Sequence, residues 1–476
     1  MSLPPLPRVR PWYRRIAARV EPLRLFRSLY EHEPTAFLYE SLEAHGGRGR
    51  YSFIGAHPRA VFRAWDDRIE LRIGDRVHED RGAPLDALRE LNQLDEGAPP
   101  VAPFCGGAVG YLSYDAVRWC ENIPRTNPDD THVPDAQFIF PREVLCFDHL
   151  EKVVHVLLYQ QKGHADRFAE LRAAVLACPP ESRRVIDLSQ VDPGETVSLR
   201  SNVSQHEFEQ MVEAAKEYIL AGDIFQVVLS QRFEFDVRTA PLRLYEALRI
   251  TNPSPYMYFL RLGGLEIVGS SPEILVRKIG RKVVTRPLAG TRRRGRTEAE
   301  DRALAAELQS DLKERAEHVM LVDLGRNDLG RVCEYGSIEL SEVLSIERHS
   351  RVMHLVSNVE GWLREECDAF DVFRATFPAG TLTGAPKVRA MQIIEELEPV
   401  RRGVFGGAIG YFSVLGDVDM CIAIRTMVLV GDKGYIQAGA GIVADSSPVL
   451  EYKETLNKAR AVARAVALAE SDASLS

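Results

Sequence analysis

Small residues precede a run of acidic residues in the segment QAGAGIVADSSPVLEYKETLNK at positions 437–458. Gly439, Ala440 and Gly441 have side chains small enough for successive backbone N–H groups to approach the carboxylate of a ligand. A helix is expected to begin near Val449, shortly after these residues. The segment therefore predicts an anion-binding cradle next to the start of a helix.

Two carboxylates and one amine follow on that helix. Glu451, Glu454 and Lys458 stand at positions i, i+3 and i+7, so their side chains share one helix face. Crowded carboxylates need a cation, and Mg²⁺ held by a few acids and completed by a substrate carboxylate fits better than a site closed by protein alone. The alternative is a solvated helix face with an ordinary ion pair between Glu454 and Lys458.

A second acidic pair lies upstream. The sequence predicts one long helix from about Glu298 to Leu324, in which Glu314 and Glu317 share a face at i and i+3, with His318 beside them. This spacing repeats the arrangement of the acids on the later helix.

The composition of the 476 residues is that of a folded, soluble protein, because 45% are hydrophobic and 27% are charged. The net charge of −8 argues against nucleic acid or an anionic membrane surface as the main partner. No apolar run reaches membrane-spanning length, and the opening MSLPPLPRVRPWYRR lacks the apolar core of a signal peptide. Seven cysteines without CxxC spacing favour reduced thiols in a cytoplasmic protein, with neither a disulfide framework nor a zinc site.

The N-terminal region, residues 1–195, is expected to be rich in strands. FCGGAVGYLSYD at 104–115 returns almost unchanged as FGGAIGYFSVLGD at 405–417, which hints at equivalent strands in two halves. A preference for small residues in close-packed strands explains the similarity as well. The other expected elements are a basic lead-in and short helix within the first 30 residues, two or three strands at 37–65, strands at 136–148 and 152–159, and a helix at 164–177. The polar stretch 178–196 is interpreted as a linker between this region and the C-terminal region, residues 196–476.

The C-terminal region alternates helices and strands. Ser204-Gln205-His206-Glu207 is a capping-box pattern, and the helix that it starts should end at Gly222. The remaining expectations are a strand at 224–233, four short strands within 256–286, a turn-rich stretch at 287–296, a strand near 337–348, a helix or strand at 351–361, a loop at 378–387, a helix at 387–397, and strands within 406–430 and 434–439.

Eight motifs stand in the order found in the chorismate-utilising enzymes: LAGTRRRG, ERAEHVMLVDLGRNDLGR, MHLVS, GTLTGAPKVRAM, GGAIGYF, CIAIRT, QAGAGIVADS and E-x-x-E-T-x-x-K. The chain resembles this superfamily from about 200 to 466, and more thinly at 37–115. Within it, the sequence is most similar to the large subunits known as component I of anthranilate synthase. The resemblance implies an α+β fold with two large, mainly antiparallel β-sheets packed face to face and helices on the outside.

The resemblance also implies roles for single residues. The four acids Glu314, Glu317, Glu451 and Glu454 would gather around Mg²⁺, which binds the ring carboxylate of chorismate. The substrate's carboxylates and enolpyruvyl group would be held by Gly290, Thr291, Thr381, Arg425, Gly439, Ala440, Gly441 and Lys458. The chemistry agrees, because chorismate is a dianion whose charge must be balanced while its C4 hydroxyl leaves.

His354, in MHLVS, is by the same resemblance a candidate for the proton transfers, with Thr381 and Lys458 as further catalytic candidates. A histidine taken by itself is more often a hydrogen-bonded interior residue. Phe405 departs from the family, which commonly has tyrosine before this strand. The missing hydroxyl removes one hydrogen bond to substrate, which costs on the order of 1 kcal/mol unless water replaces it.

Two positions favour one member of the superfamily. Relatives that add water to chorismate have a lysine base where this chain has Gln226, and glutamine cannot deprotonate water, which implies ammonia as the nucleophile. Many aminodeoxychorismate synthases have a nucleophilic lysine where this chain has Ala289. Together the residues favour direct attack of ammonia at C2 followed by loss of pyruvate, which gives anthranilate. The alternative is that both residues only pack.

Feedback control and a partner follow from the same resemblance. Ser41, Pro255, Tyr256 and Met257 match positions that enclose the inhibitor tryptophan, so the N-terminal region would be regulatory; without the family, they are a strand residue and a rigid turn. No stretch resembles a glutamine amidotransferase, so a separate small subunit would supply ammonia. The rival interpretations are component I of an aminodeoxychorismate synthase, in the folate branch, and a catalytically silent tryptophan sensor. The presence of all four acids argues against the silent sensor.

Overall fold

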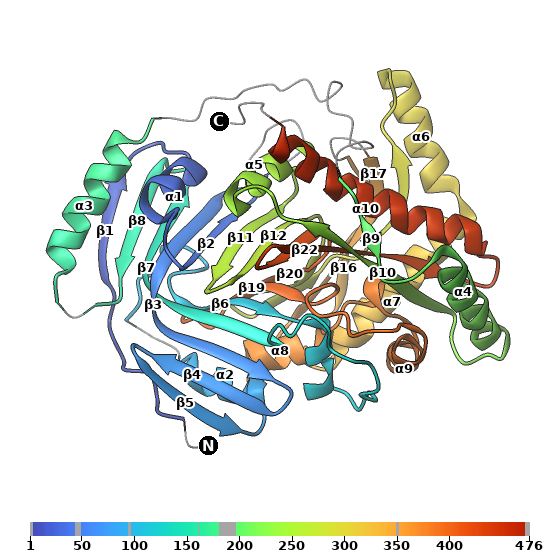
Figure 1. Cartoon of the computed structure of the whole chain (residues 1–476), viewed down its shortest axis with the longest axis horizontal. Coiled ribbons are helices and arrows are strands. Elements are labelled where there is room, and N and C mark those ends of the chain that lie inside the picture. Colours follow the sequence, from blue (N-terminus) through green and yellow to red (C-terminus); the bar gives the residue numbers. More distant parts are fainter. Residues whose placement is uncertain are drawn as a thin grey trace.

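The computed structural model of the chain describes residues 3–42, 49–93, 97–160, 162–179, 197–348 and 352–471 (Figure 1). Its α-helices are α1 (Pro22–Tyr30), α2 (Pro84–Leu91), α3 (His164–Ala177), α4 (Gln205–Leu220), α5 (Pro241–Thr251), α6 (Glu298–Ser310), α7 (Leu312–Gly330), α8 (Ala369–Thr376), α9 (Lys387–Leu397) and α10 (Pro448–Glu470). Two 3₁₀ turns, η2 (Tyr114–Trp119) and η4 (Gly380–Leu382), complete the helical elements named here.

The strands of the N-terminal region are β1 (Trp12–Ala17), β2 (Thr35–Glu40), β3 (Tyr51–Trp65), β4 (Arg68–Ile73), β5 (Arg76–Arg81), β6 (Gly107–Leu112), β7 (Ala136–Asp148) and β8 (Val153–Leu158). Those that follow are β9 (Arg200–Ser201), β10 (Gln226–Asp236), β11 (Tyr256–Leu262), β12 (Leu265–Ser271), β13 (Ile274–Ile279), β14 (Lys282–Thr285), β15 (Leu288–Arg293), β16 (Glu339–Arg348), β17 (Val352–Trp362), β18 (Gly384–Ala385), β19 (Ala408–Ser413), β20 (Val418–Ile422), β21 (Thr426–Val430) and β22 (Lys433–Ile442).

The strands of the described residues form one hydrogen-bonded network whose pairings are antiparallel. The long neighbours β3 and β7 are its common base. From β3, one branch runs through β2, β11, β12, β21 and β22 to β10. From β7, a second branch runs through β6, β19, β20, β13 and β14 to β17, which also pairs with β15 and β16.

The two branches pack face to face. On β2, Phe37 lies in an inner cluster of apolar side chains, whereas Ala36 and Leu38 lie in an outer one that includes residues of α5 and α10. Tyr39 crosses the interior, and its hydroxyl donates a hydrogen bond of 3.0 Å to the carbonyl of Gly410 on β19. The predicted arrangement of two facing antiparallel sheets with helices outside is therefore confirmed, and the two sheets are continuous through β3 and β7.

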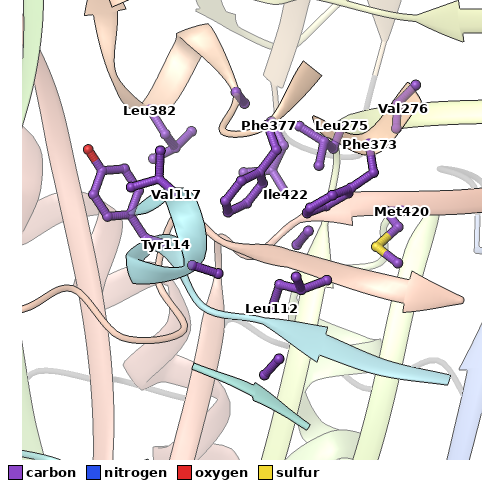
Figure 2. Packing of buried hydrophobic residues seen from close by; sticks show 14 of the residues in the cluster. Leu112, Tyr114, Val117, Leu275, Val276, Phe373, Phe377, Leu382, Met420 and Ile422 are labelled. Carbon is purple, nitrogen blue, oxygen red and sulfur yellow. The ribbon is translucent and has the colours of Figure 1, made fainter. Parts of the chain in front are cut away.

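A second outer cluster lies where α8 covers the other branch. Figure 2 shows Phe373 of α8 and Phe377 just after it, close to Ile422 of β20. Leu382, in the turn η4, packs into the same cluster. This packing anchors the loop that carries Thr381.

Several local predictions are confirmed. Helix α3 has the predicted bounds, and the four strands expected within 256–286 are β11 to β14. Helix α4 begins with both hydrogen bonds of a capping box between Ser204 and Glu207. The segment that was expected to be either helix or strand forms β17, and α10 begins one residue before Val449.

Three local predictions are wrong. The long helix expected from Glu298 is broken into α6 and α7, because Asp311 leaves the helical conformation and its carboxylate caps α7. The turn-rich stretch at 287–296 contains β15, which is held as a strand by pairing with β17. The lead-in before α1 contains β1, which pairs with β8. In each case a contact with a distant segment or a cap overrides the local pattern.

The two similar glycine-rich segments form neighbouring strands. Gly110 of β6 stands opposite Gly410 of β19. A Cβ atom would come within 2.0 Å of the Gln137 carbonyl oxygen at Gly110, and within 2.0 Å of the Asp419 carbonyl oxygen at Gly410. Close packing of strands therefore accounts for the small residues.

Positions 180–196 of the predicted linker lie outside the described residues, and the division of roles at 195 stays a prediction. In the described ranges, no helix has the length and apolarity needed to cross a membrane.

Candidate active site

The break between α6 and α7 fixes the first acid of the site. Asp311 accepts hydrogen bonds from the backbone N–H groups of Lys313, at 3.0 Å, and Glu314, at 3.2 Å. Arg292 of β15 donates to Asp311 at 2.8 Å and to Glu314 at 2.9 Å. The first turn of α7 is thereby attached to β15, which a continuous helix would not allow.

The acids of α7 and α10 act on one another. Burial raises the pKa of Glu317, and the negative charges of Glu314 and Glu454 raise it further. Burial also raises the pKa of Glu451, and the charge of Glu454 adds to the effect. Because the charge of Glu454 on α10 acts on Glu317 of α7, the acids of the two helices lie in one region of the structure.

The donor atoms of this region fit Mg²⁺ in part. Glu314 is paired with Arg292 at 2.9 Å, and Glu454 is paired with Lys458 at 2.7 Å. Within the described ranges, no group of three or more His, Cys, Asp or Glu side chains is close enough to hold a metal ion. Carboxylate oxygens are nevertheless the ligands that Mg²⁺ prefers, and it usually retains positions for water or substrate. The residues therefore fit an ion that a bound anion completes, not a site closed by the protein.

The predicted cradle lies on β22, beside β10. The Ala440 side chain is fully buried in the second outer cluster, the one that contains Phe373, so Ala440 offers only its backbone to a ligand. The carbonyl of Gly439 accepts a hydrogen bond of 2.8 Å from the ammonium group of Lys458. The cradle thus borders the face of α10 that carries Glu454.

Gln226 lies between the cradle and the acids. Its amide nitrogen donates a hydrogen bond of 3.0 Å to Glu317. A Cβ atom at Gly441 would lie 2.6 Å from that same nitrogen, so the glycine leaves room for the glutamine side chain. Ala289 of β15 is buried, at 6% exposure. Neither position supplies an amine to this region.

His354 of β17 faces β15. Its Nδ1 atom lies 2.9 Å from the carbonyl oxygen of Gly290 and 3.1 Å from the hydroxyl of Thr291. Since a carbonyl only accepts hydrogen bonds, Nδ1 carries the proton. Gly290 has a φ of +64°, and a Cβ atom there would lie 2.9 Å from an oxygen of Glu314. The structure therefore places His354 beside Gly290 and Thr291 of β15, with Glu314 of α7 next to Gly290, and the roles of these residues stay predictions.

Glu273, which stands just before β13, is a residue that the sequence motifs did not reveal. Burial raises the pKa of this carboxyl to about 8, although the Thr381 hydroxyl, the Leu288 N–H, Arg425 and Lys458 all favour its charged form. Burial lowers the pKa of the Arg425 guanidinium, and the charge of Glu273 opposes that shift. A carboxyl that keeps its proton near neutral pH is suited to proton donation. The sequence signal that points to Glu273 is a single acidic residue in the otherwise uncharged segment IVGSSPEILV.

Phe405 is buried beside Arg402, whose guanidinium carbon lies 5.8 Å from the ring centroid. Both residues line a cavity of about 20 Å³ that Gln437 also borders. The Gln437 side-chain oxygen is buried there and lacks a protein partner among the described residues. A polar cavity of this volume is large enough for one water molecule.

The four residues assigned to tryptophan meet at a separate cavity of about 960 Å³. Ser41, Pro255, Tyr256 and Met257 all line it, and it lies between the facing sheets. The turn before β11 is fixed to the end of β2, because the Leu42 N–H donates a hydrogen bond of 3.0 Å to the Ser254 carbonyl. The cavity is large enough for an indole side chain and an amino-acid backbone.

The acids of α7 and α10, the glycines of β22 and the buried Arg425 all lie within the residues that one known family covers. The chorismate binding enzyme family matches residues 34–464, and the chain belongs to this family. The resemblance seen in the motifs is thereby confirmed.

Individual relatives agree with this assignment. The chain is 46% identical to anthranilate synthase component 1 of Acetivibrio thermocellus, over 94% of this chain and 92% of that protein. It is 46% identical to the protein of that name from Thermus thermophilus, over 97% of this chain and 99% of that protein. The crystal structure of anthranilate synthase component I from Streptococcus pneumoniae matches with a TM-score of 0.77 and 40% identity, over 87% of this chain and 92% of that one. The menaquinone-specific isochorismate synthase of Escherichia coli, at 19% identity and a TM-score of 0.70, shares the fold.

Proposed function

We propose that the chain is the large subunit of an anthranilate synthase, which converts chorismate and ammonia into anthranilate, pyruvate and water in the first step of tryptophan synthesis. Its identity to component 1 proteins over nearly their whole length supports this function. The observation that carries the chemistry is Glu273, a buried carboxyl with a pKa of about 8 beside Arg425. A leaving hydroxyl needs such a proton donor.

The binding residues of this chain would balance the charges of chorismate. Arg425 and the backbone of Gly439 and Gly441 would receive its carboxylates, since a guanidinium and exposed N–H groups are strong donors to anions. A magnesium ion, when bound between the acids of α7 and α10, would neutralise the ring carboxylate. Lys458, already at the cradle carbonyl of Gly439, would add a positive charge on the same side.

The proton transfers would be shared by two residues. Glu273 would protonate the C4 hydroxyl as ammonia attacks C2, and water leaves. In the second step, a base removes the C2 proton as the enolpyruvyl group departs and is protonated to pyruvate. His354 is suited to that step, because Nδ1 is held by Gly290 and only a protonated Nδ1 makes this bond, which leaves Nε2 as the basic nitrogen.

Ammonia is the nucleophile that the site favours. Gln226 is bound to Glu317 through its amide and has no basic nitrogen, so it cannot activate water. Ala289 cannot form a covalent bond to the ring, which argues against the aminodeoxychorismate alternative. We propose that a glutamine amidotransferase subunit in the cytoplasm supplies the ammonia.

The purified chain is expected to form anthranilate from chorismate, Mg²⁺ and an ammonium salt, and to form none when glutamine replaces ammonium. Fluorescence and mass spectrometry identify the product, and addition of a glutaminase subunit should restore the reaction with glutamine. Accumulation of 4-amino-4-deoxychorismate would move the enzyme to the folate branch, and isochorismate would show that water is the nucleophile.

We propose that tryptophan inhibits by binding in the 960 Å³ cavity. Ser41→Arg places a long cation in the space beside the Pro255 turn, so inhibition should weaken by at least tenfold, about 1.4 kcal/mol of binding free energy. Inhibition curves and calorimetry measure the effect. Ser341→Arg, on the exposed part of β16 outside this cavity, is the matched control and should stay sensitive. Equal inhibition of the Ser41 variant and the wild type would exclude this site.

A further inference from the structure

The turn that borders the tryptophan cavity is joined to the backbone of Arg425. Ser270, at the end of β12, is fully buried, and its hydroxyl lies 2.8 Å from that of Ser254. The same hydroxyl hydrogen bonds to the carbonyl of Asn252. The Ser270 N–H donates a hydrogen bond of 3.2 Å to the Arg425 carbonyl. One small residue therefore links the turn to the proposed substrate-binding arginine.

Tyr256 makes a second link, across the cavity to the facing sheet. Its hydroxyl donates a hydrogen bond of 2.8 Å to Asp419 of β20 and accepts one of 2.8 Å from Arg277 of β13. Arg277 also donates to Asp419 at 2.9 Å, and the two residues stand directly opposite each other in the paired strands. The three side chains close a triangle that a ligand in the cavity would touch, because all three line it.

The strands that hold this triangle continue into the active site. Strand β13 begins immediately after Glu273, and β20 is followed closely by Arg425. The Ile422 N–H donates a hydrogen bond of 3.1 Å to the Glu273 carbonyl, which ties the two strand ends together. At about 3.3 Å of rise per residue, the four steps along the strand from Glu273 to Arg277 span about 13 Å.

Arg425 is held in an uncommon conformation. Its φ of +51° lies in the left-handed region, which a non-glycine residue adopts only when its surroundings impose it. The hydrogen bond from Ser270 is one of those surroundings. A shift of the turn would therefore be felt by the arginine backbone.

We propose that Ser270 and the pair Asp419–Arg277 are positioning residues that couple the tryptophan cavity to Glu273 and Arg425. The inference rests on the proposed inhibition by tryptophan. A ligand beside Tyr256 moves the triangle and the turn, and both motions reach Glu273 and Arg425 in the active site. By linkage, tryptophan and chorismate must then weaken each other's binding by the same factor, usually about 5- to 150-fold in coupled sites.

The test compares binding with coupling in Ser270→Ala, Asp419→Asn and the double variant. Calorimetry gives the tryptophan Kd without chorismate, and the change in the chorismate KM at saturating tryptophan gives the coupling factor. We expect each single variant to bind tryptophan with a Kd within about threefold of wild type, and the double variant to lose most of the 5- to 150-fold coupling. A merely structural defect would weaken tryptophan binding or lower the Tm. It would not lower the coupling factor while leaving the tryptophan Kd unchanged.

Tyr39→Phe is the matched control. It also removes a hydroxyl from a cavity-lining residue, but that hydroxyl donates its hydrogen bond to the carbonyl of Gly410 on β19, away from the strand ends at Glu273 and Arg425. Its coupling factor should equal that of wild type. An unchanged coupling factor in the double variant would overturn the inference. If Asp419→Asn fails to fold, Tyr256→Phe opens the same triangle, and coupling retained there and in Ser270→Ala overturns it as well. Absence of tryptophan binding to the wild type would refute the proposed inhibition, which is a different outcome.

Discussion

Glu317→Gln and Glu454→Gln are each expected to lower kcat at saturating Mg²⁺ by at least about 10³-fold, because stabilisation by a metal ion is worth several kcal/mol and 1.36 kcal/mol is tenfold in rate. Glutamine keeps the shape of each side chain but removes the charge that a cation needs. Mn²⁺ binding, followed by electron paramagnetic resonance, should weaken in parallel. The fold should persist in Glu317→Gln, because burial and the charges of Glu314 and Glu454 both raise the pKa of Glu317, so the loss of its charge relieves repulsion.

Asp323→Asn is the control for these variants. Asp323 lies on α7 as well, but it is half exposed and pairs with Arg326 at 2.8 Å, one turn along the helix surface. Such exposed pairs contribute about 0–1 kcal/mol, so turnover and Mn²⁺ affinity should match wild type. Full activity in both glutamine variants at saturating Mg²⁺ would remove the metal site from the proposal.

Glu273→Gln is expected to lower kcat by about 10²- to 10⁴-fold, the range for loss of a general acid. In the wild type, kcat/KM should fall as the pH rises through about 8, because the carboxyl then loses the proton that it donates. The variant should lack this limb of the pH profile. Glu266→Gln, on β12, is the control, because burial raises the pKa of that carboxyl too, although it lies outside the proposed site. An unaltered pH limb in Glu273→Gln would assign proton donation to another residue.

The pH dependence of the free energy of unfolding should report the ionisation of Glu273 independently of activity. The pKa of Glu273 rises from 4.5 to about 8 on folding, so between these values the folded chain holds a proton that the unfolded chain has released. The free energy of unfolding of the wild type should therefore fall as the pH rises from about 5 to 8. Glutamine cannot ionise, so the variant should lose this contribution to the slope. Denaturant titrations at several pH values measure it, and identical slopes would contradict the buried neutral carboxyl.

Local patterns in the sequence were sufficient for much of the site. The i, i+3 spacing of the acids depends only on helix geometry, and the capping box at Ser204 depends on four consecutive residues. The glycines at the cradle predict close approach of the backbone, and at Gly441 a Cβ atom would indeed lie 2.6 Å from the Gln226 amide nitrogen. These features depend on residues that are close together in the sequence, so they can be predicted without knowledge of the fold.

The sheet required information that no segment contains. β6 and β19 are some 300 residues apart and pair directly, as a network of antiparallel strands allows. The helical pattern runs through Asp311 and does not predict the break there. The cap is local, but the hydrogen bonds from Arg292 of β15 that hold Asp311 and Glu314 are tertiary contacts. Local propensity is a weak prior where such contacts compete with it.

Sequence alone therefore determined which residue types could bind a dianion and on which helix faces they stand. The tertiary structure decided how those residues act on one another. Glu273 has an ordinary carboxyl in the unfolded chain, and its pKa near 8 arises because strands from distant segments exclude water from it. The same packing places the cavity of about 960 Å³, which we propose for tryptophan, between the facing sheets, and Ser270 and Asp419 connect it to strands that end at the proposed active site. Burial and coupling are properties of the assembled layers, which a one-dimensional pattern does not contain.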